Sequence, residues 1–194
     1  MICAVLGYQA VITVPDKTSL EKINTMKAFG AKVIICKKVE PDSPEHYNNK
    51  AEILSKADKG SLFFNQYGSD ENVQAHYQTT AVEIWQQTQG RIDYLVAAAS
   101  SGGTITGVAK YLKAKNPNIK MILPDPIGSI FYSHFHHVDY HKQSYQVEGA
   151  GKDRVCTIHD FRYIEMVSTK AQRKSDGKTG KQIKRFVNVQ SQKY

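Results

Sequence analysis

The hydrophobic and polar positions of this chain alternate between the periods of strands and helices. Residues 9–14 are rich in β-branched side chains and stop at Pro15, which predicts a buried strand. Apolar residues at helical spacing then predict a helix, which a capping box (Thr18-x-x-Glu21) begins and Gly30 ends.

The same alternation continues to about residue 123. The pattern predicts further helices at 45–56, 71–88 and 104–114, and further strands at 32–37, 61–64, 93–98 and 120–123. Strands separated by helices form crossover connections and a mostly parallel sheet that helices cover on both faces. The predicted fold class is therefore α/β, with a doubly wound, mostly parallel sheet.

Positive charge is concentrated at one end of the chain. The net charge is +8, and residues 169–194 hold eight Lys and Arg against one acidic residue. These residues also include few apolar anchors, so we expect a domain at 1–168 followed by a basic, disordered tail. A near-neutral domain does not favour a specific nucleic-acid partner, and such a tail binds polyanions only weakly and without sequence preference.

Other sequence features point away from membranes, disulfides and metals. No apolar stretch reaches the roughly 18 residues of a membrane span, and the apolar start lacks a basic flank, so we expect a cytoplasmic protein. Cys3, Cys36 and Cys156 lack C-x-x-C spacing, which favours reduced thiols. The histidines at 134–141 accompany no established zinc motif, so we expect a surface loop and no metal site.

A run of small residues joins the strand predicted at 93–98 to the next helix. Gly102 and Gly103 allow backbone N–H groups to converge on one point, and Ser101 and Thr104 add hydroxyl groups. The run contains neither a Walker A motif nor a dinucleotide fingerprint, so a phosphate monoester fits best. The alternative is a tight turn that uses small residues for steric reasons alone.

Further motifs surround this loop. They are 30–31 (Gly-Ala), 65–67 (Asn-Gln-Tyr), 76–80 (His-Tyr-Gln-Thr-Thr) with 83–84 (Glu-Ile), 101–107 (Ser-Gly-Gly-Thr-Ile-Thr-Gly), 125–126 (Asp-Pro), 128–129 (Gly-Ser) and 148–151 (Glu-Gly-Ala-Gly). Across most of residues 2–160, their order and spacing resemble the pyridoxal-phosphate-dependent β-replacement family of cysteine synthase and cystathionine β-synthase. Residues 42–45, 125–129 and 145–149 are more similar to cystathionine β-synthase. The resemblance implies the tryptophan synthase β-like fold, known as fold type II.

The resemblance also implies roles for two groups of residues. The group that binds the cofactor phosphate is Ser100, Ser101, Gly102, Gly103 and Thr104, with Ser100 where the family usually has glycine. The group on the substrate side is Gln66, Tyr67, Gly149 and Ala150, the last two in a loop that closes over the substrate. For Tyr67 the alternative is an aromatic residue that packs at the rim.

The implied reaction replaces the β-substituent of serine, or of an activated serine, with a thiol such as homocysteine or sulfide. Pyridoxal phosphate acts as the electron sink. Amino acids are then the implied substrates, and a homodimer is the implied assembly of the full-length form.

Two parts of the family's active site have no counterpart in this sequence. The Schiff-base lysine segment, with its Ser-Gly-Asn-Thr-Gly loop, lies upstream in the family, and a Gly-Ser-Ser-type motif lies downstream. No catalytic residue is therefore identified. We expect a fragment of the enzyme that is inactive alone, and the alternative is a non-catalytic remnant.

Overall fold

The computed structural model describes residues 1–145, 147, 149–169 and 186–189. The chain divides into two compact units, Met1–Asn65 and Gln66–Tyr194. All the residues predicted to bind the cofactor or the substrate belong to the second unit.

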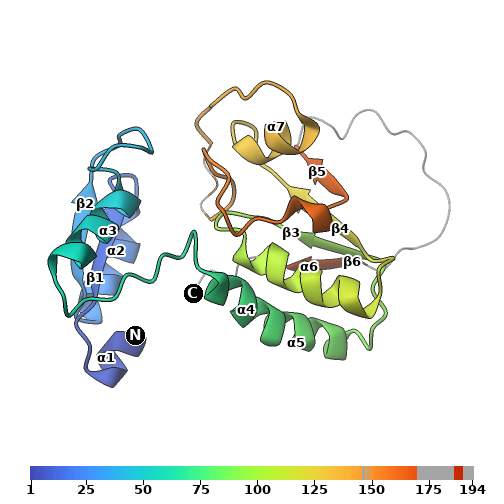
Figure 1. The fold of residues 1–194 in the computed structure, drawn as a ribbon, viewed down its shortest axis with the longest axis horizontal. Helices are drawn as coiled ribbons and strands as arrows, with labels where there is room; N and C mark the ends of the chain where they lie inside the picture. The colour runs from blue at the N-terminus through green and yellow to red at the C-terminus, as the bar shows by residue number, and fades with distance from the viewer. Residues whose placement is uncertain (146, 148, 170–185, 190–194) are drawn as a thin grey trace. The chain divides into compact units, whose positions relative to one another are not determined.

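The Met1–Asn65 unit is a small strand–helix–strand arrangement (Figure 1). Its elements are α1 (Ile2–Leu6), β1 (Val11–Pro15), α2 (Leu20–Ala28), β2 (Lys32–Cys36) and α3 (Tyr47–Ala57). The two strands pair in parallel, from Val11 opposite Lys32 to Pro15 opposite Cys36. Only a few apolar side chains of this unit, among them Val14 and Ile23, are buried.

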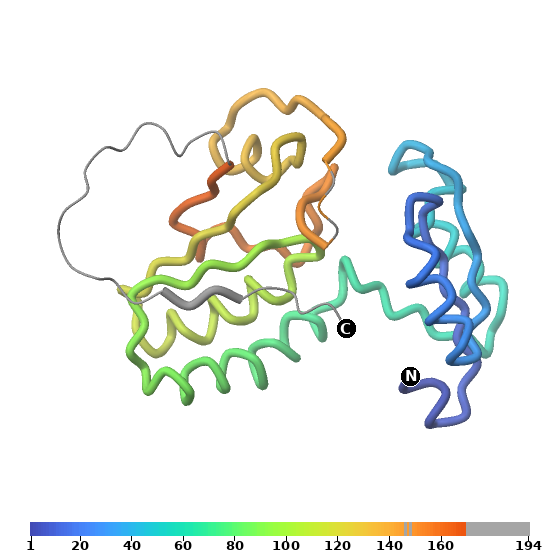
Figure 2. The backbone as a smooth tube through the Cα atoms, turned by 180° about the vertical axis from the view of Figure 1, so that it is seen from behind, coloured from blue at the N-terminus to red at the C-terminus, as the bar shows by residue number. Residues whose placement is uncertain are grey.

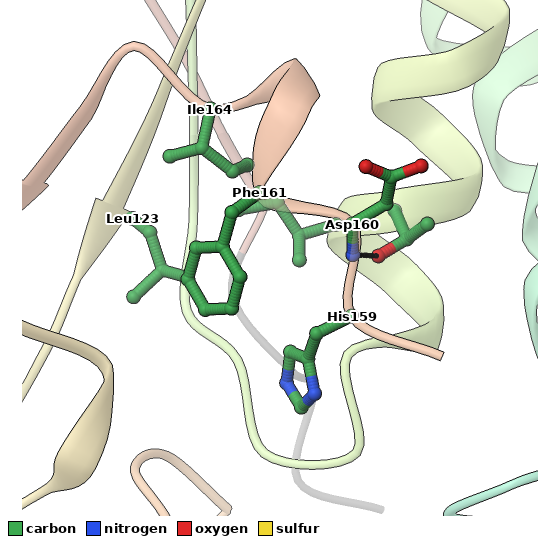
Figure 3. Close-up of a pocket in the computed structure, with 7 residues that line it drawn as sticks. Leu123, His159, Asp160, Phe161 and Ile164 are labelled. Carbon is green, nitrogen blue, oxygen red and sulfur yellow. Dashed lines mark hydrogen bonds between the residues drawn. The ribbon is translucent and has the colours of Figure 1, made fainter. Parts of the chain in front are cut away.

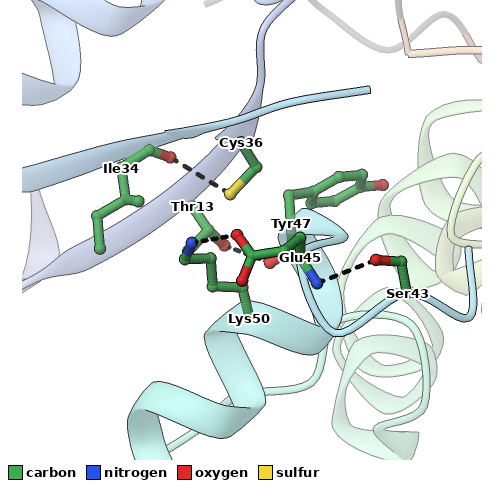
Figure 4. Close-up of polar contacts among 7 residues, drawn as sticks. All are labelled: Thr13, Ile34, Cys36, Ser43, Glu45, Tyr47 and Lys50. Carbon is green, nitrogen blue, oxygen red and sulfur yellow. Dashed lines mark hydrogen bonds and ion pairs between the residues drawn. The ribbon is translucent and has the colours of Figure 1, made fainter. Parts of the chain in front are cut away.

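Polar contacts fix the start of α3 against β1 (Figure 4). The hydroxyl of Thr13 donates a hydrogen bond to the carbonyl oxygen of Tyr47 at 2.7 Å. Glu45 and Lys50 form a partly exposed ion pair at 2.7 Å, which contributes little stability because solvent screens it. Burial raises the pKa of the Cys36 thiol, and the charge of nearby Lys50 opposes that rise.

The Gln66–Tyr194 unit is built on a four-stranded parallel sheet in the order β5-β4-β3-β6. The strands are β3 (Tyr94–Ala97), β4 (Lys120–Pro124), β5 (Met166–Ser168) and β6 (Phe186–Val189). The helices are α4 (Asp70–Gln78), α5 (Thr80–Gln87), α6 (Gly103–Lys115), α7 (Ile130–His136) and the 3-10 turn η1 (Phe161–Tyr163). Figures 1 and 2 show α4 and α5 alongside α6, which connects β3 to β4. The α/β class with parallel strands is confirmed.

The core of this unit lies between α6 and the sheet. Leu95, Val108, Leu112 and Met121 are completely buried there. Gly107 lets α4 come close to α6, because a β-carbon at this position would overlap the carbonyl oxygen of Val73. The start of α6 is therefore held firmly by its neighbours.

Several predicted elements differ from the observed ones. Residues 61–64 form no strand, since they pair with no neighbouring strand and Leu62 and Phe64 stay largely exposed. The helix predicted at 71–88 divides at Thr79, whose φ of −119° and ψ of −77° interrupt it. The capping box is wrong, because Ser19 precedes α2 and no side chain caps the helix.

The predicted tail at 169–194 lies mostly outside the described residues. The exception after residue 169 is β6, which pairs in parallel with β3. For Phe186–Val189 the prediction of disorder is wrong, because this Phe-Val-Asn-Val run satisfies its backbone groups in the sheet. In the described part of the chain, every helix is too short or too polar to cross a membrane.

We expect Leu112→Ala to lower the free energy of unfolding of the second unit by about 2–5 kcal/mol, because it leaves a cavity in a closed core. Urea unfolding followed through Trp85, the single tryptophan, measures the effect in this unit. Val138→Ala is the control within the same unit, since its side chain is 53% exposed. An equal effect of the two substitutions would contradict the assignment of the core.

Candidate functional site

The turn between β3 and α6 depends on glycine at two positions. Gly102 precedes α6 with a φ of +95°, which favours glycine over any residue with a β-carbon. A β-carbon on Gly102 would lie 2.5 Å from the ring of His159, and one on Gly103 would overlap the side-chain amide of Asn72. The steric reason for small residues therefore holds at both glycines.

The same turn also presents donors that an anion can use. Within the described residues, the backbone N–H groups of residues 101–104 have no hydrogen-bond acceptor. They lie at the start of a 13-residue helix, where the helix dipole adds partial positive charge. Ser100, Ser101 and Thr104 are half-buried, so the turn remains accessible. These features fit the phosphate group of a monoester.

A short chain of hydrogen bonds fixes the hydroxyl of Thr104. Its Oγ1 lies 3.0 Å from Nε2 of His76, and Nδ1 of His76 lies 3.0 Å from Oγ1 of Thr80. Burial lowers the pKa of His76, so the imidazole is neutral at pH 7 and each nitrogen has a defined role as donor or acceptor. The Thr104 oxygen is consequently held in one place at the start of α6.

Asn72 joins the segment of Gln66 and Tyr67 to this turn. Its Nδ2 donates to the backbone oxygen of Gln66 at 2.8 Å and to Oγ of Ser101 at 3.2 Å. The ring of Tyr67 packs against a buried cluster that includes Cys156. The side chain of Gln66 is exposed, and that of Tyr67 is half-buried.

The segment with Gly149 and Ala150 also reaches the turn. The backbone N–H of Gly151 donates to the carbonyl oxygen of Ala99 at 2.7 Å, directly before the phosphate-binding candidates. Gly149 and Gly151 have φ values of +79° and +80°, so both positions favour glycine. The structure thus brings all three predicted segments together at the carboxyl end of β3.

Sequence reasoning missed His159, whose ring packs against Gly102 in the turn. Its ring stacks on Phe161 with 5.9 Å between centroids, and its Nδ1 accepts a hydrogen bond from the N–H of Cys156 at 3.1 Å. Its buried Nε2 has no partner among the described residues. Figure 3 shows the pocket beside it, which has no room for a water molecule. No motif surrounds His159, so the sequence offered no indication of this role.

The family motif at 125–129 has a structural role here. Asp125 is 4% exposed, and its Oδ2 accepts a hydrogen bond from the N–H of Tyr132 in the first turn of α7. Burial raises the pKa of this carboxyl group. Ser129 Oγ accepts a hydrogen bond from the N–H of Lys152 at 3.0 Å. The motif therefore anchors the chain that follows Gly151.

The histidines predicted to lie in a surface loop belong partly to α7. His136 Nε2 lies 3.0 Å from the carbonyl oxygen of Val167, and the ring of His134 lies 4.8 Å from that of Phe161. In the described ranges, no three His, Cys, Asp or Glu side chains gather as a metal ion requires. Packing and the hydrogen bond to Val167 account for His134 and His136.

We expect the second unit to lose stability as the pH falls from about 7.5 to about 5.5. Burial lowers the folded-state pKa of His76 and His159, so the unfolded chain binds more protons below its own pKa of about 6.5. Urea titrations of Trp85 fluorescence at both pH values measure the loss. His76→Gln should reduce it, and an undiminished loss in this variant would contradict the contribution of His76.

The comparisons with known proteins agree on one family. Residues 1–190 match the family described as pyridoxal-phosphate dependent enzyme. A cystathionine β-synthase from Apis mellifera is 43% identical over 172 residues, which cover 85% of this chain and 33% of that protein. A putative mitochondrial cysteine synthase from Saccharomyces cerevisiae is 40% identical over 184 residues, which cover 83% of this chain and 45% of the relative.

A solved structure extends the agreement to the fold. A hydrogen sulfide-producing enzyme from Fusobacterium nucleatum aligns with a TM-score of 0.74 and 30% identity, over 88% of this chain and 55% of that chain. The chain spans about a third of the length of the curated cystathionine β-synthase from Apis mellifera. The resemblance found in the sequence and the fold type II architecture are both confirmed, and the chain belongs to the family of pyridoxal-phosphate dependent enzymes.

Proposed function

We propose that this protein acts in a β-replacement reaction of the cystathionine β-synthase type, in which serine and homocysteine give cystathionine and water. The curated relatives from several organisms carry this name, and the motifs at 125–129 and 145–149 favour it. The proposal concerns a whole enzyme. The matched relatives are much longer than this chain, which covers 33% of the Apis mellifera protein.

The observation that carries the proposal is the set of donors at the start of α6. The N–H groups of residues 101–104, together with the fixed oxygens of Ser101 and Thr104, would hold the cofactor phosphate. When bound, pyridoxal phosphate supplies an electron sink for negative charge at the α-carbon of an amino acid. Ser100 and the two glycines shape the turn that presents these donors.

Gln66, Tyr67, Gly149 and Ala150 would line the substrate side. The bond from Asn72 to the Gln66 oxygen positions the first pair, and the bond from Gly151 to Ala99 positions the second. Both pairs lie beside the turn without occupying its donors. In this arrangement they would orient the amino acid and exclude water from it.

A cysteine synthase-type reaction is the second candidate, because relatives of that name also match the chain. The two candidates differ in the thiol, which is homocysteine in one and sulfide in the other. The homodimer, the cytoplasmic location and the partial domain at 1–168 stay predictions.

We expect Ser101→Ala and Thr104→Val each to weaken the binding of pyridoxal phosphate about fivefold to tenfold, because each removes one hydroxyl from the phosphate site. Equilibrium dialysis against pyridoxal phosphate and against pyridoxal, which lacks the phosphate, separates phosphate recognition from ring recognition. Ser133→Ala is the control, because the Ser133 hydroxyl donates to the carbonyl oxygen of Asp139, away from the turn at residues 101–104. Variants that keep the wild-type preference for the phosphorylated form would exclude this site.

The reaction itself is tested by product analysis. The whole enzyme of the proposal is loaded with cofactor and supplied with serine and with homocysteine or sulfide, and the products are identified by mass spectrometry. Cystathionine is the expected product, and a protein that forms only cysteine from sulfide supports the second candidate. The absence of both products would contradict the proposed function.

A further inference from the structure

Lys152 places a cationic side chain in a nearly buried position next to the candidate substrate residues. The residue is only 9% exposed. Its Nζ lies 3.9 Å from the centroid of the Tyr67 ring, a contact that attracts a cation to the face of an aromatic ring. Long charged side chains are rarely buried in this way without a specific interaction.

The backbone fixes Lys152 on both sides. Its N–H donates to Oγ of Ser129 at 3.0 Å, and its carbonyl oxygen accepts from the N–H of Ile130 at 2.9 Å. The preceding residue, Gly151, is bonded to Ala99 at the carboxyl end of β3. Lys152 therefore cannot leave the site without rearranging the segment that joins the predicted substrate loop to the turn.

The electric field of this ammonium group reaches the turn itself. Burial lowers the pKa of His159, and the positive charge of Lys152 lowers it further. His159 is the residue whose ring packs against Gly102. A negative group that enters between Tyr67 and the turn would consequently lie in a region of positive potential.

We propose that Lys152 is a specificity-determining residue that binds the carboxylate of the thiol substrate, so that the site prefers anionic thiols over neutral ones. The inference deepens the proposed function and rests on it. The cofactor phosphate has its own donors at residues 101–104, whereas Lys152 lies at Tyr67, on the side proposed for the substrate. An ammonium group at this place can bind a carboxylate through a charge-assisted hydrogen bond, which is stronger than a hydrogen bond between neutral groups.

The test compares two thiols of similar size, mercaptopropionate and mercaptoethanol, as acceptors for the cofactor-loaded whole enzyme of the proposal with serine. The wild type should prefer the anionic thiol, and Lys152→Met should reduce that preference about tenfold, mainly through KM. Lys152→Arg should recover most of it. Lys115→Met is the matched control, because Lys115 also lies over a tyrosine ring, at 5.5 Å from the centroid of Tyr111, but is exposed.

A binding measurement makes the test independent of turnover. Saturation-transfer NMR with methylthiopropionate and methylthioethanol, which cannot react as thiols, should show the same preference in the wild type and its loss in Lys152→Met. If this pattern is seen but no product forms from serine, the proposed function fails and the role of Lys152 stands. If products form with an unchanged thiol preference in Lys152→Met, the role of Lys152 is refuted and the proposed function stands.

Two controls separate a change in thiol recognition from a change in folding or in cofactor binding. The urea midpoint of Trp85 fluorescence shows whether Lys152→Met and Lys152→Arg fold like the wild type. Dialysis with pyridoxal phosphate shows whether Lys152 serves the cofactor instead. A loss of cofactor affinity with unchanged thiol preference, or a borohydride-stable cofactor adduct on Lys152, would overturn the proposal.

Discussion

The second unit depends on one constraint: a short turn joins β3 to α6 and fixes the N–H groups of residues 101–104, which have no acceptor among the described residues, at the carboxyl end of β3. α6 cannot shift to hide them, because its apolar side chains are locked into the core and Gly107 holds it against α4. Buried or half-buried backbone donors require a partner. An anion at this position would satisfy several of them together.

The steric need for glycine and the proposed anion binding concern the same turn. His159 and Asn72 occupy the space beside Gly102 and Gly103, which forces glycine at both positions. The same Gly102, with its φ of +95°, precedes α6, whose first N–H groups have no acceptor in the described part of the chain. Asn72 then links the turn to Gln66, so the packing that requires glycine also holds a predicted substrate residue beside the turn.

The sequence predicted the features that depend on local pattern. Apolar runs marked β1 to β4, and the small residues at 100–104 marked the turn. The errors arose where distant contacts decide. Residues 61–64 have strand composition but no partner, and Thr79 breaks a helix whose periodicity continues through it. Lys152 and His159 belong to a segment without clear periodicity, and only the tertiary structure shows that they pack beside Tyr67 and Gly102.

The most direct test of the central claim is phosphorus NMR of the bound cofactor. A phosphate held by the N–H groups of residues 101–104 should remain a dianion shielded from solvent, so its resonance should stay constant between about pH 5.5 and about pH 8. The phosphate of free cofactor titrates in this range, with a second pKa of about 6. A bound resonance that follows the solution pH in the same way would contradict the account.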